Sequence, residues 1–162
     1  AECLPTYVQQ KNIDLVTRHG IYTETELRAR YAIHLEAYNK IVAIEARTML
    51  DMAVHQILPA AMHYTKDLCD ALVVKKSVGA SCNAETVLIR NLSGHTDSLH
   101  DAIETLRHSL DNVPKQREAA AMYYHDTIVP GMNALRAEAD ILETLTEKSY
   151  WPYPTYSDLL FY

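Results

Sequence analysis

The feature that most constrains the fold is the stretch from Thr23 to about Lys76, which keeps helical periodicity with no glycine inside it. Thr23 followed by Glu26 is the capping-box pattern that starts a helix. Apolar side chains then recur at helical spacing along one stripe: Leu27, Tyr31, Leu35, Tyr38, Val42, Met49 and Met52. A second apolar stripe consists of Ile33, Ala37, Ile41 and Ile44. A helix with so wide an apolar side is not stable alone, so we expect the remaining segments to cover it.

Three more helices are predicted around this one. A short helix from Tyr7 to His19 should end at Gly20, since glycine suits the left-handed residue after a helix. A loop from Ser77 to Asn83 precedes a helix over residues 84–110. The second half of that helix carries a seam with the spacing of coiled-coil packing: Leu99, Ile103, Leu106, Leu110 and Val113.

The last predicted helix is opened by Pro114 and runs over residues 115–148. Its expected core side consists of Met122, Tyr123, Val129, Met132, Leu135, Leu142 and Leu145. Pro59 and Pro130 each fall inside a long helix and predict a kink there. The sequence therefore predicts an all-α fold, a single domain over residues 1–162. We expect a bundle of about four helices, two of them long and proline-kinked.

The residues around the two prolines resemble each other, residues 55–62 beside residues 125–132. This recurrence fits a duplicated helix pair, or two kinks that pack at the same level of a bundle. We favour the second interpretation because the similarity fades outside these residues.

Helical periodicity stops at Ser149, and the next seven residues hold two prolines and four aromatic rings. The prolines force an extended path, and the aromatic side chains need an apolar surface to cover them. We therefore predict an aromatic strap from Tyr150 to Tyr162 that docks through its rings, with Lys148 and Asp158 adding little. It would lie on the chain's own bundle or on a neighbour, and the alternative is a disordered end.

Composition narrows the functional classes. A formal net charge of −6 argues against a nucleic-acid surface, and no apolar run reaches the ~20 residues that cross a bilayer. The three cysteines show no CxxC spacing, which favours a reducing cytoplasm over a disulfide framework. The first residue is not methionine, and we expect an excised piece of something longer.

The candidate chemistry is sparse. His100, Glu104 and His108 share one helix face and could offer metal ligands, but a solvated face is the commoner explanation. His55 and His125 are expected to be satisfied polar residues near the kinks. No nucleophile, phosphate-binding or zinc-protease motif occurs. We therefore assign no catalytic, cofactor-binding or metal-binding residue, and we expect a scaffold or an interaction module.

Two blocks of the sequence are distinctive: one runs from Leu4 to Leu27, and the other, more specific one runs from Tyr150 to Phe161. Together with residues 30–36 and 123–126, they resemble the C-terminal region of type III glutamine synthetases. The resemblance implies an enzyme that forms glutamine from glutamate, ammonia and ATP with Mg or Mn, in a ring-shaped homo-oligomer. Its catalytic domain would precede Ala1, so this fragment alone is expected to be inactive. Its partners would be that catalytic domain and neighbouring subunits.

A second hypothesis rests on the residues without the resemblance. It is a free-standing helical bundle that binds a protein or a ligand through its aromatic tail. The reading frame upstream of Ala1 separates the two hypotheses, since only the first requires a catalytic region there.

Overall fold

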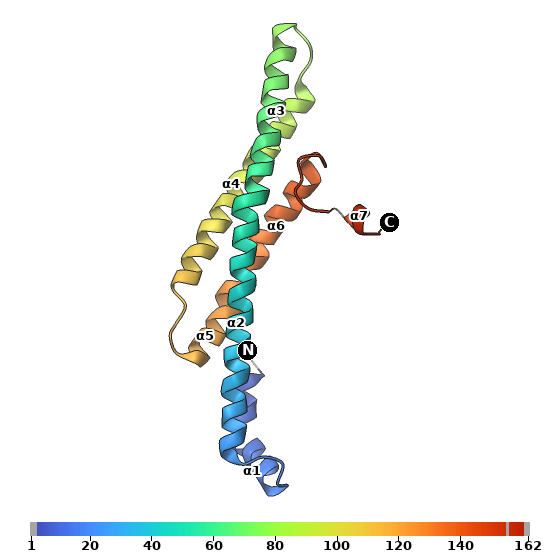
Figure 1. Cartoon of the computed structure of the whole chain (residues 1–162). Coiled ribbons are helices and arrows are strands. Elements are labelled where there is room, and N and C mark those ends of the chain that lie inside the picture. Colours follow the sequence, from blue (N-terminus) through green and yellow to red (C-terminus); the bar gives the residue numbers. More distant parts are fainter. Residues whose placement is uncertain (1–2, 155, 161–162) are drawn as a thin grey trace. The chain divides into compact units, whose positions relative to one another are not determined.

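A computed structural model describes residues 3–154 and 156–160, and these residues contain helices and no strand (Figure 1). The elements in chain order are the 3-10 helix η1 (Leu4–Val8), α1 (Gln10–Arg18), α2 (Glu24–Met52), the π-helix η2 (Ala53–Ile57), α3 (Leu58–Ser77), α4 (Asn83–Asp111), α5 (Arg117–Tyr123), the π-helix η3 (Tyr124–Ile128), α6 (Val129–Leu145) and α7 (Tyr156–Leu160). The all-α class is confirmed.

The chain divides into two compact units. Unit 1 holds Ala1–Arg47 and His108–Pro130, and unit 2 holds Thr48–Arg107 and Gly131–Tyr162. Each unit is therefore built from two separate stretches of the sequence. The single-domain organisation stays a prediction.

In unit 1, the corner between α1 and α2 is fixed by local hydrogen bonds. Gly20 has φ +63°. The Gly20 N–H donates to Thr17 O and the Ile21 N–H donates to Val16 O, which are the two hydrogen bonds of a Schellman motif. Thr23 N–H then donates to the Glu26 carboxylate at 2.8 Å, while Glu26 N–H donates to Thr23 Oγ1 at 3.2 Å. Both the predicted helix end and the predicted capping box are confirmed.

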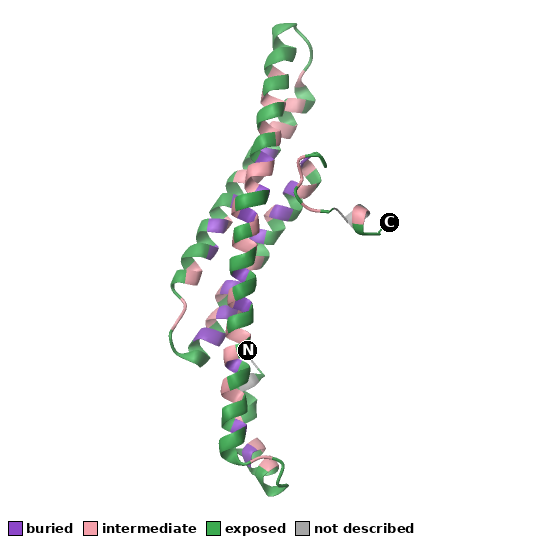
Figure 2. Cartoon of the chain, in the orientation of Figure 1, coloured by how far each residue is buried: buried purple, intermediate pink, exposed green. Residues whose placement is uncertain are grey.

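The rest of unit 1 packs on one side of α2. Leu27, Leu35 and Val42 are buried, as the first stripe predicts, and Ala46 joins them (Figure 2). The Asn39 side chain donates to Arg117 O at 3.1 Å, which ties α5 to α2. The second predicted stripe is not buried: all four of its residues are exposed, Ile33, Ala37, Ile41 and Ile44. The expectation that other segments cover it is wrong for the described residues.

In unit 2, α3 and α4 form a hairpin through a short loop. Gly79 has φ +72°, and the Gly79 and Ala80 N–H groups bond back to Lys76 and Lys75 in a second Schellman motif. Lys75 also pairs with Glu85 across the loop. These contacts confirm a loop here, although it covers residues 78–82 and is one residue shorter at each end than predicted.

The seam of α4 is the core of unit 2. Leu99, Ile103 and Leu106 are at most 1 % exposed. A Cβ on Gly131 of α6 would lie 3.3 Å from a Leu106 methyl, so the two helices pack closely there. The predicted seam is confirmed for Leu99, Ile103 and Leu106, whereas Leu110 and Val113 are half-buried.

The helix predicted over residues 115–148 needs three corrections. It ends at Leu145 and not at residue 148. It begins at Arg117 and not next to Pro114, because the Gln116 side-chain oxygen accepts the Ala119 N–H and caps the helix. Met122 is 40 % exposed, whereas Ala120, Ala121 and Tyr124 are buried. At this end of the helix, the buried side is therefore formed by Ala120, Ala121 and Tyr124 and not by Met122.

Each internal proline follows a π-helical turn. The turns cover Ala53–Ile57 and Tyr124–Ile128, in each case ending two residues before a proline. Proline lacks an N–H and its ring collides with the carbonyl four residues earlier, and the wider π turn accommodates both effects. The two similar sequence contexts thus share one local structure, and the interpretation of two kinks at the same level of a bundle stays a prediction. The kinks themselves stay a prediction.

Candidate functional site

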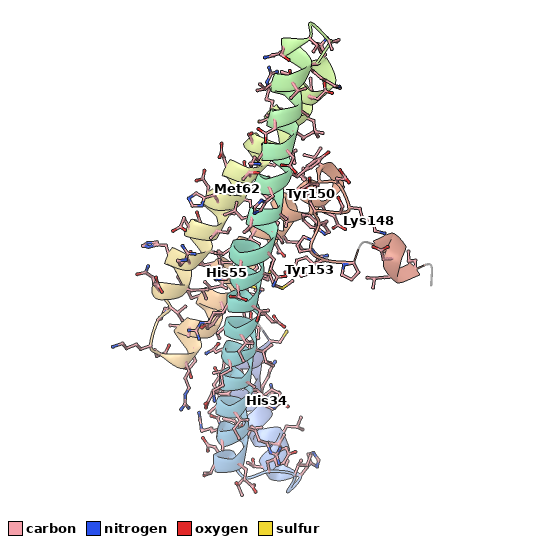
Figure 3. All side chains as sticks on the ribbon, turned by 45° about the horizontal axis from the view of Figure 1, so that its top comes forward. His34, His55, Met62, Lys148, Tyr150 and Tyr153 are labelled. Atoms are coloured by element: carbon pink, nitrogen blue, oxygen red, sulfur yellow. The ribbon has the colours of Figure 1, made fainter. Side chains whose placement is uncertain are left out.

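The aromatic tail of unit 2 contacts α3 through Tyr150. Its ring centroid lies 5.1 Å from that of Tyr64, and its hydroxyl donates to the Asp67 carboxylate (Figure 3). This hydrogen bond lowers the pKa of Asp67 and raises the pKa of Tyr150, because it stabilises the ionised carboxylate and the neutral phenol. One side chain therefore supplies both an apolar and a polar contact for the tail.

Beyond Tyr150, the tail lines a groove with a volume of ≈ 190 Å³. The groove is lined by Trp151, Tyr153 and Pro154 from the tail and by Met49, Met52, Ile57, Leu135, Arg136, Ala139, Asp140 and Glu143 from the helices. The lining therefore combines apolar side chains with three charged ones.

Tyr153 is the unusual member of this groove. Its hydroxyl oxygen is buried and has no hydrogen-bond partner among the described residues. Burial raises the pKa of Tyr153, with a smaller contribution from the negative charge of Asp51. An unpaired buried hydroxyl costs free energy, so an additional donor or acceptor placed here would be stabilising.

At the far edge of the tail, Lys148 pairs with Asp158 in α7. The sequence predicts these charges at the edge of the tail, but it does not predict the helix Tyr156–Leu160. Docking of the tail as a strap stays a prediction, and its last two residues, Phe161 and Tyr162, lie outside the described residues.

A second candidate surface lies on α2 in unit 1. Ile33, Ile41 and Ile44 are 64 %, 56 % and 63 % exposed, and Ala37 between them is exposed as well. We call these four residues the isoleucine face. The stripe itself is evident in the sequence, whereas its exposure is not.

The histidines singled out in the sequence do not converge on a metal site. Glu104 pairs with Arg107, and the Asn112 amide donates to His108 O at 2.7 Å. Over residues 3–154 and 156–160, no three His, Cys, Asp or Glu side chains are grouped so that they could hold a metal ion. These residues therefore offer no fit for the divalent metal that the resemblance implies for the parent enzyme.

The two histidines near the prolines have carboxylate neighbours. His55 Nε2 lies 3.6 Å from Asp51, and His125 Nδ1 lies 2.7 Å from Asp126. His125 fits the expectation of a satisfied polar residue, whereas the His55 distance is too long for a hydrogen bond and the expectation for His55 stays a prediction. Sequence reasoning missed the pair formed by His95 Nδ1 of α4 and Glu138 of α6 at 2.8 Å, because 43 residues separate them and no spacing rule connects them.

The described residues thus form an all-α fold, with an apolar groove in unit 2 and an exposed apolar helix face in unit 1. None of its described helices has the length and apolar content needed to span a membrane.

Comparison with known proteins then gives the family. The family model described as the glutamine synthetase C-terminal domain matches residues 1–76. Over 99 % of its length, the chain is 35 % identical to a glutamine synthetase of Butyrivibrio fibrisolvens. It is 27 % identical to a glutamine synthetase of Bacteroides fragilis (strain YCH46) and to a type-3 glutamine synthetase of Dictyostelium discoideum.

The chain spans 23 % of the length of each of these relatives and matches their C-terminal part. Residues 1–76 thus match the glutamine synthetase C-terminal domain family. The resemblance seen in the sequence is confirmed.

Proposed function

We propose that this chain is the non-catalytic C-terminal helical domain of a cytoplasmic glutamine synthetase, and that it supports the folding or the oligomeric assembly of that enzyme. The parent enzyme would join ammonia to glutamate with ATP and Mg or Mn in a catalytic part that precedes Ala1. The match of the whole chain to the C-terminal part of three glutamine synthetases supports this proposal.

The observation that carries the supporting role is the two-sided apolar character of α2. Leu35 and Val42 are buried on one side, while Ile33 and Ile41 are exposed on another. An apolar stripe along a helix normally packs against another segment. Unit 1 covers only one of the two stripes, so α2 is suited to contacts within a larger assembly.

A second candidate function is a free-standing bundle that captures a partner protein at the aromatic tail. The buried, unpaired Tyr153 hydroxyl in the groove favours it, because a partner could supply the missing hydrogen bond. An upstream stop codon next to Ala1 would support this alternative, and an upstream catalytic region would support the glutamine synthetase domain.

The test compares three polypeptides: the 162-residue chain, the full-length parent, and a truncated parent that ends before residue 1 and so lacks these 162 residues. We expect ATP-dependent glutamine formation from the full-length parent and none from the chain alone. We expect the truncated parent to lose its native mass, measured by light scattering, or its solubility. Glutamine formation by the chain alone above a boiled control would contradict the proposal. A truncated parent with unchanged mass, stability and activity would contradict it equally.

A further inference from the structure

The isoleucine face of α2 has the geometry of a contact surface. Ile33, Ala37, Ile41 and Ile44 follow one another at spacings of four, four and three, so they lie above one another on a single side of the helix. The buried residues Leu35 and Val42 point to another side. Isoleucine is a frequent core residue, and a single exposed isoleucine on a protein surface is ordinary. Three exposed isoleucines on one helix face form a continuous apolar patch.

Three of the charged residues beside this face, Arg30, Glu36 and Lys40, have partners within unit 1. Lys40 Nζ lies 2.7 Å from the Glu36 carboxylate, and the pair lowers the pKa of Glu36. The Arg30 guanidinium lies 4.4 Å from the ring centroid of Tyr22. Glu45 and Arg47 beside Ile41 and Ile44 carry opposite charges. A partner therefore meets an apolar stripe flanked by charges of both signs, which fits an apolar occupant better than a charged one.

The size of the patch selects the kind of occupant. At ~1.5 Å per residue and a helix diameter of ~10 Å, a stripe from Ile33 to Ile44 offers on the order of 200 Å². Each partner in a stable interface between separate proteins buries about 800 Å². The patch is thus too small to hold a second copy of the chain alone. It is large enough for a segment of the same polypeptide, whose tether gives it a high effective concentration.

We propose that the isoleucine face docks onto an apolar helix or sheet surface in the part of the parent polypeptide that precedes this chain. This inference rests on the proposed function and names the surface through which the domain supports its enzyme. More than three quarters of the length of each relative lies outside the matched part, so the parent has ample chain to supply this surface.

The experiment places the photo-crosslinking amino acid p-benzoylphenylalanine at position 33 or 41 of the full-length parent. Position 74 serves as the matched control, because Val74 is 64 % exposed, the same as Ile33, and lies on α3 outside the isoleucine face. After irradiation, mass spectrometry maps the linked peptides. We expect positions 33 and 41 to link to peptides that precede residue 1. Links to α2 of a second copy, links only within the 162 residues, or a yield no higher than that of position 74 would each overturn the inference.

A variant series in the same full-length parent provides a second readout. Lysine is a good helix former, and at position 41 it lies four residues from Glu45, so Ile41→Lys keeps α2 helical. We expect Ile41→Lys to lower the melting temperature of the full-length enzyme, while Ile41→Leu and Val74→Lys leave it unchanged. Equal melting temperatures for Ile41→Lys and Val74→Lys would contradict the docking role of this face.

The truncation of the parent and the Ile41→Lys variant together separate failure of the inference from failure of the proposed function. If truncation before residue 1 disrupts the parent but Ile41→Lys does not, the domain supports its enzyme through another surface. If truncation itself has no effect on mass, stability or activity, the proposed function fails, and the docking inference fails with it.

Discussion

Tyr150 shows how a single side chain can make the position of the tail depend on pH in two directions. Its phenol donates a hydrogen bond to Asp67, and this contact requires a protonated phenol and is strongest with an ionised carboxylate. The pKa of Asp67 is lowered from its ordinary value of 3.8, and the pKa of Tyr150 is raised from 10.0, in each case chiefly by this bond.

The sign of the pH dependence follows from these directions. A lowered carboxyl pKa gives stability that is present above the unfolded value and is lost as the pH falls through the folded value of Asp67. A raised phenol pKa gives stability that is present below the unfolded value and is lost as the pH rises through the folded value of Tyr150. We expect the tail to be held most firmly between these limits.

Iodide quenching of the sole tryptophan, Trp151, measures this effect as a function of pH. We expect quenching to increase at both ends of the pH range in the native sequence. In Tyr150→Phe it should be higher in the middle of the range and should change less towards either end. An identical pH profile in the two proteins would show that this hydrogen bond does not hold the tail.

Glycine positions give a second prediction at this scale. Gly20 has a positive φ, so Gly20→Ala should lower the free energy of unfolding by about 1–2 kcal/mol. Gly94 lies inside α4, and a Cβ there meets no atom within 4 Å. Gly94→Ala should therefore raise it by about 1 kcal/mol through helix propensity. Urea unfolding of both variants checks the opposite signs, and two changes of the same sign would contradict the assignment.

Among the elements, α2 depends on its first turn. The Thr23 hydroxyl accepts the Glu26 N–H, and the Glu26 carboxylate accepts the Thr23 N–H. The bond from the Thr23 backbone is the main cause of the lowered pKa of Glu26. The same network should therefore be present at neutral pH and weaken as the pH falls through the folded pKa of Glu26.

Removal of the cap tests this description. Thr23→Ala should lower the free energy of unfolding by about 1 kcal/mol, since the Glu26 N–H loses its acceptor. Thr25→Ala, two residues further along and inside α2, serves as the control and should change it little. Denaturant unfolding at neutral pH measures both. Equal effects at the two positions would show that the capping box contributes nothing specific.

The seam of α4 is the second element-scale test. Leu99 is fully buried in unit 2, so Leu99→Ala should lower the free energy of unfolding by about 2–5 kcal/mol. Leu110, the fourth seam residue, is only half-buried, and its alanine variant should have a clearly smaller effect. A smaller loss at Leu99 than at Leu110 would contradict the packing described for this helix.

For the whole molecule, the decisive question is whether the tail is docked in solution. Trp151 is half-buried at the groove, and the preceding residue, Tyr150, is held by its hydrogen bond to Asp67. We expect a blue-shifted emission that iodide quenches poorly. Because its side chain is only half-buried, Trp151→Ala should cost about 2 kcal/mol, less than the ~3–5 kcal/mol typical of a fully buried tryptophan. Emission like that of free tryptophan would contradict docking on this chain.

Local sequence determined where most helices begin and end. Three kinds of local feature form between near neighbours in the chain: the capping box, the two Schellman motifs and the π turns before the prolines. The capping box and the Schellman motif each have a residue pattern that identifies them. The seam of α4 was equally readable, because a period of about 3.5 to 3.6 residues marks one side of a helix. The start of α5 was missed because a Gln cap is a weaker signal than Pro114.

Tertiary structure decided which apolar side of α2 is covered, and which distant side chains meet. Both stripes of α2 carry the same periodic signal, but burial depends on the elements that pack against each side, and these leave the isoleucine face exposed. The contacts His95–Glu138 and Tyr150–Asp67 join residues 43 and 83 positions apart. Helical periodicity fixes the direction of a side chain around its own axis, whereas its partner is fixed only when separate segments pack together.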